Sequence, residues 1–467
     1  MLFPSISFLF LFLPFVIGGY YILPKEARNT FLLLTSIVFY GWNSPKLVAL
    51  MLAVIFVNYL GAFFIASFKN KIFFKKVALV TTLLIDFGIL GYFKYIDFFI
   101  ENLNQFLGSN YTFMNVVLPL GISFYTFQAV SYTVDVYRNT ELVQKNPFRL
   151  ALFISLFPQL IAGPIIRYHD IYQQIEKRSE SWNLFFSGLK RFIIGLGKKV
   201  IIANTLAETA DKILVLPAEQ LDFAISWLGV ISKGISVYFD FSGYSDMAIG
   251  LGLMFGFKFL ENFNYPFVSK SITEFWRRWH ISLGMWFREY VYFPLGGSRV
   301  GAFRHYFNLF AIFFLIGLWH GASWNFVLWG CWFGIFVIIE KLIHFDREAT
   351  HWFVNVFKRI WTLFIFFFSI SLIHTDTLQQ ATNYIRVMLG MEHPQKIVFT
   401  FRYYVDNYFW SVFVIACLGG LGLFKSLLSN TNKWIQGCIW LFLVPVFLWS
   451  VISIISTTYN PFIYFHF

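Results

Sequence analysis

His320 lies within an apolar run long enough to cross a membrane, in the segment LWHGASWN (318–325). An ionisable side chain at such depth is costly and marks a functional site by default. Imidazole takes up or releases a proton near neutral pH, which suits general acid–base catalysis. The small residues 321–323 leave room for a ligand, and the amide of Asn325 can orient an imidazole or polarise a carbonyl. The segment therefore predicts a proton-transfer site at His320 and Asn325; the alternative is a core histidine bonded to a neighbouring helix.

A second cluster of functional side chains is the segment EFWRRWHISL (274–283). One interpretation is an interfacial amphipathic helix with an aromatic belt. The other is a basic cytoplasmic entrance for a phosphorylated donor, because planar guanidinium groups bind phosphate with two parallel hydrogen bonds. In that case Trp276, Arg277 and Arg278 bind the donor, and His280 lies within reach of the interior.

The carboxyl-terminal residues 460–467, NPFIYFHF, form a short aromatic tail with one phenol, Tyr464. Aromatic residues are enriched at membrane–water interfaces, so an interfacial anchor is one interpretation of this tail.

The composition predicts the elements that must position these residues. The chain has 467 residues, of which 58% are hydrophobic and 13% charged, whereas a soluble domain carries about a quarter charged residues. Runs such as 2–24, 46–68, 77–100 and 434–455 are long enough to cross about 30 Å of hydrocarbon. We therefore expect an all-α polytopic membrane protein, one domain of about 10–12 spans.

Basic residues give the orientation. Lys25, Arg28 and the basic stretch 69–76 predict two cytoplasmic loops, and 101–115 contains no Lys or Arg. The amino terminus should therefore lie outside the cytoplasm, in a multi-pass protein of the plasma (inner) membrane. A long basic stretch further along the chain, 258–304, should also be cytoplasmic. A helix leaving the cytoplasm after Arg304 carries residue 320 about 24 Å inward.

Two further segments indicate a protein built around a cavity. Residues 156–164, LFPQLIAGP, are apolar but interrupted by Pro and Gly. Such a re-entrant or broken segment is tolerated at membrane depth only where protein covers it or it lines a cavity. Residues 167–199 are basic and amphipathic, and we expect them at the cytoplasmic surface.

The remaining composition argues against other classes. The net charge of +12 is explained by basic loops beside spans, and no nucleic-acid-binding pattern accompanies it. The three cysteines are scattered in apolar runs without ligand spacing, so we predict packing roles and no metal site.

Several long motifs, in order, resemble the membrane-bound O-acyltransferase (MBOAT) family. Within the family they are most similar to the bacterial branch that acetylates extracellular polysaccharides such as peptidoglycan and alginate. The matching segments are 1–14, 118–128, 157–164, 238–248, 275–283 and 318–326. The resemblance implies a fold with re-entrant segments and a central tunnel, with a catalytic core at about 116–345.

The resemblance also implies site residues. His320 matches the catalytic histidine of the family, and His280 its second characteristic position. Acetyl-CoA would be the donor, without a metal. The tail resembles the Phe-x-Tyr-Phe ending of this branch, so Tyr464 would accept the acyl group and relay it.

The acyl group would pass from the tail to an extracytoplasmic acetyltransferase partner of the SGNH type, which reaches the polysaccharide. Membrane lipid is the other expected partner. Peptidoglycan is our first expectation for the acceptor, and alginate or another exopolysaccharide is the alternative. A different class, a transporter of an acylated substrate, also fits a buried histidine with basic loops.

Overall fold

The computed structural model describes residues 1–42, 44–345, 350–375, 377–392, 399–428, 430–457, 459 and 461. Within these ranges the regular structure consists of helices, without a β-strand. The expected all-α fold class is confirmed. The chain forms two compact units, residues 1–192 with 247–260 and residues 193–246 with 261–467.

Unit 1 is the amino-terminal helical unit, held together by aromatic packing. Phe8 and Phe12 of η1, Phe39 of α2 and Phe157 of α7 come from three segments, and their rings lie within 6.3 Å of one another in successive pairs. Its elements are η1 (Ser7–Phe12), α1 (Leu13–Ile22), α2 (Lys25–Gly41), α3 (Pro45–Ser67), α4 (Ile72–Leu107), α5 (Ile122–Arg138), η2 (Thr140–Leu142), α6 (Pro147–Ser155), α7 (Phe157–Leu160), α8 (Tyr168–Glu176) and the first part of α9 (Trp182–Gly197).

The segment expected to be broken is broken and buried. α6 ends at Ser155, the four-residue α7 follows, and residues 161–166 are not helical yet remain buried. The backbone N–H of Phe157 donates to the hydroxyl of Ser36 at 3.1 Å. Protein covers this irregular backbone, as the hydrophobic surroundings require.

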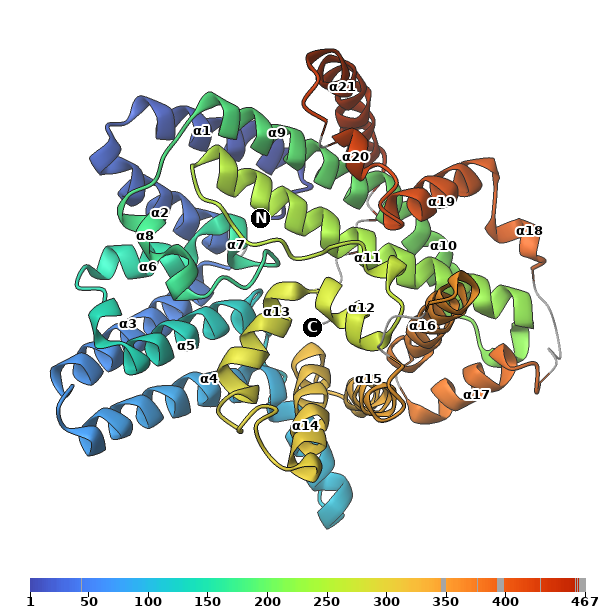
Figure 1. The fold of residues 1–467 in the computed structure, drawn as a ribbon, viewed down its shortest axis with the longest axis horizontal. Helices are drawn as coiled ribbons and strands as arrows, with labels where there is room; N and C mark the ends of the chain where they lie inside the picture. Colours follow the sequence, from blue (N-terminus) through green and yellow to red (C-terminus); the bar gives the residue numbers. More distant parts are fainter. Residues whose placement is uncertain are drawn as a thin grey trace. The chain divides into compact units, whose positions relative to one another are not determined.

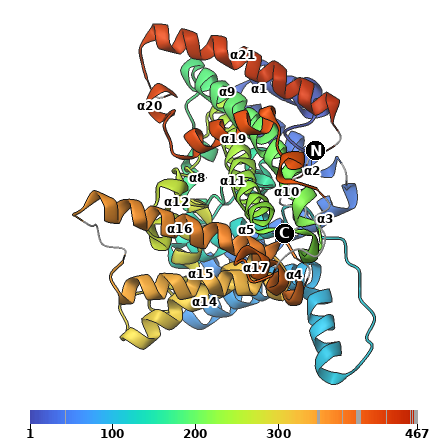
Figure 2. The same ribbon diagram turned by 90° about the vertical axis from the view of Figure 1, so that its right-hand side faces the viewer.

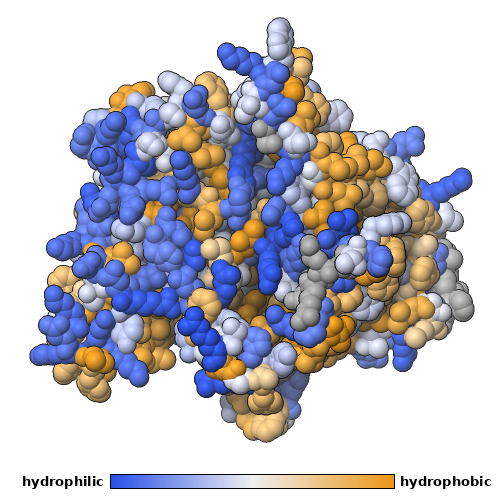
Figure 3. Space-filling model, viewed as in Figure 1, coloured by the Kyte–Doolittle hydropathy of each residue, from blue (hydrophilic) through white to orange (hydrophobic). Residues whose placement is uncertain are grey.

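Hydrophilic side chains gather on one face of unit 1 over α8 (Figure 3). α8 buries Tyr168, Ile171 and Ile175 and exposes Gln173 and Glu176. This segregation is that of an amphipathic surface helix.

Unit 2 contains the candidate site. Figure 1 shows α12 and α13 between α11 and the pair α14–α15. Figure 2 shows α14 and α15 side by side, with α16 next to them. Its elements are the end of α9, η3 (Lys198–Ala203), α10 (Asn204–Leu214), η4 (Ala218–Gln220), α11 (Phe223–Met254) up to residue 246, η5 (Pro266–Val268), α12 (Ile272–Arg278), α13 (Ile281–Phe287), η6 (Arg288–Tyr292), α14 (Ala302–His320), α15 (Trp324–Leu342), α16 (Trp352–Ile373), α17 (Leu378–Met388), α18 (Phe401–Tyr404), α19 (Asn407–Gly420), α20 (Lys425–Leu428) and α21 (Lys433–Ser456).

Five helices of the described ranges are long and apolar enough to cross a membrane: α3, α14, α15, α16 and α21. Ser7–Ile22 and Asn407–Gly420 are shorter apolar helices. The chain is an integral membrane protein, and the total of 10–12 spans stays a prediction.

Candidate active site

Two glycines bring α14 and α15 into close contact below His320. A Cβ atom on Gly317 would lie 2.4 Å from the carbonyl oxygen of Phe326, and one on Gly330 would lie 2.3 Å from that of Phe313. Small residues at a helix interface allow the backbones to approach this closely in membranes. The two helices therefore form a rigid hairpin with His320 as the last residue of α14.

The imidazole of His320 is enclosed by two indoles. Its ring centroid lies 4.9 Å from that of Trp319 and 5.0 Å from that of Trp329, in both cases nearly perpendicular. The residue is 7% exposed. The surroundings of His320 thus exclude most water, which strengthens any electrostatic interaction with a bound group.

His280 joins α12 to α13 in a left-handed backbone conformation, with φ of +44°. This conformation is rare for residues other than glycine and costs energy. Three contacts of Asn262 hold the turn. Its backbone oxygen accepts from the N–H of Ile281 at 2.9 Å, and its side-chain Oδ1 accepts from the N–H of Ser282 at 3.2 Å and from Ser282 Oγ at 2.9 Å.

Asn262 also fixes the tautomer of His280. The Asn262 Nδ2 donates to Ser245 Oγ at 3.0 Å, which orients the amide. Oδ1 then faces Nδ1 of His280 at 3.2 Å and can only accept. The proton of the neutral ring is therefore on Nδ1, and the lone pair is on Nε2. This Nε2 is buried and has no hydrogen-bond partner among the described residues.

The structure brings His280 and His320 to the same indole. The ring of His280 lies 5.9 Å from that of Trp319, which borders His320. Burial lowers the pKa of His280 well below its ordinary value, and the charge that His320 carries when protonated lowers it further. His280 lies outside the five candidate spans, and it is neutral at physiological pH.

The three residues expected to bind the donor differ in accessibility. Arg277 is exposed. The guanidinium of Arg278 pairs with Glu274 at 2.8 Å and donates to the backbone oxygen of Asn264 at 3.1 Å. Trp276 points into the protein and packs on aromatic rings of α14 and α15 at centroid distances of 5.1–5.8 Å. Arg277 is therefore the member of this set that is free to meet a ligand without breaking a described contact.

A buried carboxylate ties α12 to α15. Glu340 is 2% exposed and accepts from the N–H of Ile272 at 2.6 Å, the N–H of Thr273 at 2.9 Å and Thr273 Oγ1 at 3.1 Å. These donors belong to the first turn of α12, where backbone N–H groups lack partners within the helix. Glu340 was not among the predicted site residues, although an acidic residue in an apolar run is a signal for such a role.

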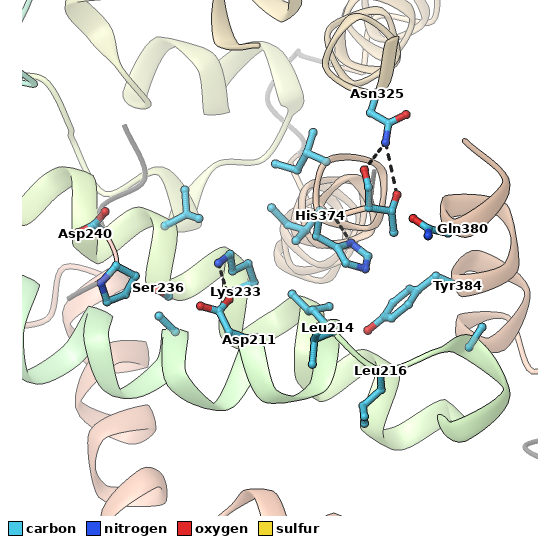
Figure 4. A pocket seen from close by; sticks show the side chains of 18 of the residues that line it. Asp211, Leu214, Leu216, Lys233, Ser236, Asp240, Asn325, His374, Gln380 and Tyr384 are labelled. Atoms are coloured by element: carbon cyan, nitrogen blue, oxygen red, sulfur yellow. Dashed lines mark hydrogen bonds and ion pairs between the residues drawn. The ribbon is translucent and has the colours of Figure 1, made fainter. Parts of the chain in front are cut away.

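The side chain of Asn325 contacts the segment after α16. Its amide nitrogen donates to the backbone oxygen of Thr375 and lies 3.4 Å from Thr375 Oγ1. Asn325 also borders a cavity of about 910 Å³ within unit 2 (Figure 4). The cavity reaches Ser323, three residues after His320.

Two ion pairs lie in the wall of this cavity. Lys233 contacts Asp211 at 2.7 Å, and Lys199 contacts Asp240 at 2.8 Å. Glu219 also lines the cavity and is exposed. The other polar lining residues carry amide, hydroxyl or imidazole groups: Asn204, Ser236, Ser323, Asn325, His374, Thr375, Gln380, Asn383 and Tyr384.

The chain after α21 reaches the same cavity. The hydroxyl of Tyr459 donates to Asp211 at 2.5 Å. Lys199 donates to the backbone oxygen of Pro461, which lines the cavity. Tyr464 lies outside the described residues.

Comparisons with known proteins identify the family. The sequence model of the membrane-bound O-acyltransferase family matches residues 143–376. The chain is 44% identical over 350 residues to the probable alginate O-acetylase AlgI of Azotobacter vinelandii, covering 74% of this chain and 70% of that protein. It is 36% identical over 427 residues to the peptidoglycan O-acetyltransferase of Helicobacter pylori, covering 84% of this chain and 80% of that protein.

The chain belongs to the membrane-bound O-acyltransferase family. The predicted family and the prediction of an acyltransferase are confirmed. A teichoic acid D-alanyltransferase of Bacillus subtilis is also similar, at 31% identity over 258 residues, covering 51% of this chain and 62% of that protein.

The matched region of the acyltransferase contains every expected site residue except Tyr464. It also contains Asn262 and Glu340, which position His280 and α12.

Proposed function

We propose that this acyltransferase takes an acetyl group from cytoplasmic acetyl-CoA and passes it across the membrane for O-acetylation of an extracytoplasmic polysaccharide. The observation that carries the proposal is the convergence of two buried histidines, His280 and His320, on Trp319 at the end of α14. The names of the relatives, which include O-acetyltransferases of alginate and peptidoglycan, support acetyl transfer to a hydroxyl.

The chemistry assigned to His320 is general-base catalysis. The base takes the proton of an acceptor hydroxyl as its oxygen attacks the thioester carbonyl and forms a C–O bond. The tetrahedral intermediate collapses, the C–S bond breaks, and the CoA thiolate leaves with a proton from the imidazolium. His280, with its lone pair on Nε2, is the second group able to accept a proton or a hydrogen bond there. Asn325 holds the segment after His320 against Thr375.

Basic residues near the ends of three helices support entry of the donor from the cytoplasm. α14, α15 and α16 are consecutive and antiparallel, so Arg304, Lys341 and Arg359 lie near one set of ends. The positive-inside rule assigns such ends to the cytoplasm of the plasma (inner) membrane. On this assignment Arg277 and Arg278 contribute to the donor entrance, with Trp276 forming its packed base.

The opposite ends of these helices border the cavity, and in this proposal the cavity lies on the acceptor side. Ser323 and Thr375 line it from those ends. The charged donor then need not cross the membrane, which would be costly. The acetyl group alone passes from one side to the other.

Tyr464 is the proposed relay. Pro461 lines the cavity and is held by Lys199. Tyr464 follows Pro461 by three positions in the sequence. A partner enzyme of the SGNH type outside the cytoplasm would then take the acetyl group from the tail.

Purified protein in detergent with radiolabelled acetyl-CoA separates a transferase from a transporter. We expect release of free CoA thiol, lost in His320→Ala and retained in His305→Ala, a matched histidine change at the start of the same helix. Uptake of label into proteoliposomes without thioester cleavage would instead establish the transporter.

The acceptor polymer has two candidates. Peptidoglycan stays our first prediction, and the 44% identity to an alginate relative favours alginate or another exopolysaccharide as the second. Deletion of the gene, followed by measurement of O-acetyl esters in each envelope polysaccharide, identifies the polymer. A loss from peptidoglycan supports the first candidate and contradicts the second.

A further inference from the structure

The connection between α3 and α4 of unit 1 is a basic segment, KNKIFFKK (69–76), that the proposed transfer step does not use. Figure 1 shows this connection at the outer ends of the two helices. The fourth lysine, Lys75, is half-buried, and its Nζ lies 4.8 Å from the ring centroid of Tyr137 on α5. The other three lysines of the segment are exposed: Lys69, Lys71 and Lys76.

The positive charge of this segment has no counter-charge in the protein. None of its lysines is ion-paired among the described residues, and the sequence contains no Asp or Glu between Glu26 and Asp86. Stabilisation of α4 does not explain the lysines either. The first turn of α4 contains no acidic residue, and the helix dipole adds further positive charge at this end. A ligand with negative charge is therefore the matching partner.

The length of α3 places these lysines at the depth of lipid headgroups. α3 is one of the five candidate membrane spans and has 23 residues. A helix of that length extends about 34 Å, slightly more than the roughly 30 Å of hydrocarbon in a bilayer. Its last residue, Ser67, precedes Lys69 by two positions. The basic segment therefore begins where the phosphate groups of a bilayer lie.

Apolar side chains between the lysines favour a lipid over a soluble anion. Ile72 is 76% exposed and Phe73 is 72% exposed. Phe74 is also exposed, and its ring packs on that of Phe68, beside the end of α3, at a centroid distance of 5.4 Å. A soluble phosphate would leave these side chains in water, which is unfavourable. A membrane–water interface accommodates both the aromatic rings and the charges beside them.

We propose that residues 69–76 form a binding site for the phosphate headgroups of anionic phospholipids. The lysine ammonium groups attract the headgroup charge, and Ile72, Phe73 and Phe74 enter the interface beside the acyl chains. A basic residue near an anionic membrane surface contributes about 1 kcal/mol, or about fivefold in affinity. The site does not depend on the proposed acetyl transfer.

Titration of the full-length protein in neutral detergent with dioleoyl phosphatidylglycerol tests the proposal. Native mass spectrometry gives the dissociation constant of the first bound lipid, which should be lower than for zwitterionic dioleoyl phosphatidylcholine. Lys71→Gln should weaken phosphatidylglycerol binding about fivefold, and Lys69→Gln, Lys71→Gln and Lys76→Gln combined should weaken it about 100-fold. Lys212→Gln is the matched control, because Lys212 is exposed but pairs with Glu208 at 2.8 Å. It should leave the affinity unchanged.

Replacement by arginine separates the charge from the identity of the side chain. Arginine at positions 69, 71 and 76 should retain most of the affinity. Equal affinity for the two lipids would overturn the proposal, as would wild-type affinity in the triple glutamine variant or in Lys71→Gln. Displacement of phosphatidylglycerol by millimolar inorganic phosphate or coenzyme A would also overturn it, and would assign the segment to a soluble phosphate.

Discussion

Replacement of Asn262 tests whether His280 acts as a neutral imidazole with its lone pair on Nε2. Asn262→Ala removes the oxygen that accepts from His280 Nδ1 and from the N–H and hydroxyl of Ser282. The backbone N–H and the imidazole N–H then lie buried without this acceptor, at about 1–3 kcal/mol each. We expect the free energy of unfolding to fall by about 2–6 kcal/mol.

Asn262→Ala should also lower the catalytic rate, because the His280 ring is no longer held in one tautomer. General acid–base catalysis contributes about 10²–10⁴-fold, so a freely turning His280 should lower the rate of CoA release by about 10- to 100-fold. Ser282→Ala is the matched control, because it removes one partner of Asn262 and leaves the contact to His280 intact. It should retain most of the rate.

Asn262→Asp distinguishes the effect of the His280 tautomer from the effect of the charge on the His280 ring. The carboxylate still accepts from Nδ1, and it stabilises the protonated ring, which raises the pKa of His280 from its lowered value. His280 is proposed to act when neutral, and it becomes protonated as the pH falls through its pKa. The acidic limb of the pH–rate profile should therefore move to higher pH than in the wild type.

Two measurements in detergent test this role of His280: the rate of CoA release as a function of pH, and the thermal unfolding midpoint of each variant. A wild-type rate in folded Asn262→Ala would show that the orientation of His280 is unimportant. An acidic limb in Asn262→Asp that stays in place or moves to lower pH would refute the assignment of a neutral His280.

Three further predictions concern the supports of the site. Glu340→Ala leaves the N–H groups of the first turn of α12 without their buried acceptor and should cost about 2–4 kcal/mol of unfolding free energy, with a smaller loss in Glu340→Gln; equal midpoints would contradict the capping role. Gly317→Ala places a Cβ 2.4 Å from a backbone oxygen, so it should lower the free energy of unfolding by about 1–3 kcal/mol and also lower the rate of CoA release. Gly301→Ala, whose Cβ would have no atom within 4 Å, should change neither quantity. Arg277→Ala should raise the KM for acetyl-CoA several-fold at unchanged kcat, and an unchanged KM would remove Arg277 from the donor entrance.

The elements of the site could largely be predicted because their signals are local. An ionisable residue in an apolar run singled out His320, and the Pro- and Gly-containing stretch 156–164 indicated a buried break that the structure contains. The apolar runs gave the all-α class. These inferences need only the cost of burying charge and backbone polar groups.

The contacts that orient the site could not be predicted because they depend on long-range packing. Asn262 lies 18 residues before His280 and meets it only in the folded protein. Lys199 and Asp240 come from different helices, and the role of Arg278 is limited by its pairing with Glu274. The left-handed backbone conformation at His280 was likewise not predictable, because the residue is not a glycine.

The central claim is that His320 acts as the general base in the transfer of an acetyl group from a donor on the cytoplasmic side. Membrane vesicles from cells expressing the protein test it most directly, because acetyl-CoA added outside reaches the cytoplasmic face only in inverted vesicles. We predict release of free CoA from inverted vesicles, little from intact right-side-out vesicles, and none above background from inverted vesicles containing His320→Gln. Equal release from both intact orientations, or wild-type release with His320→Gln, would contradict the account.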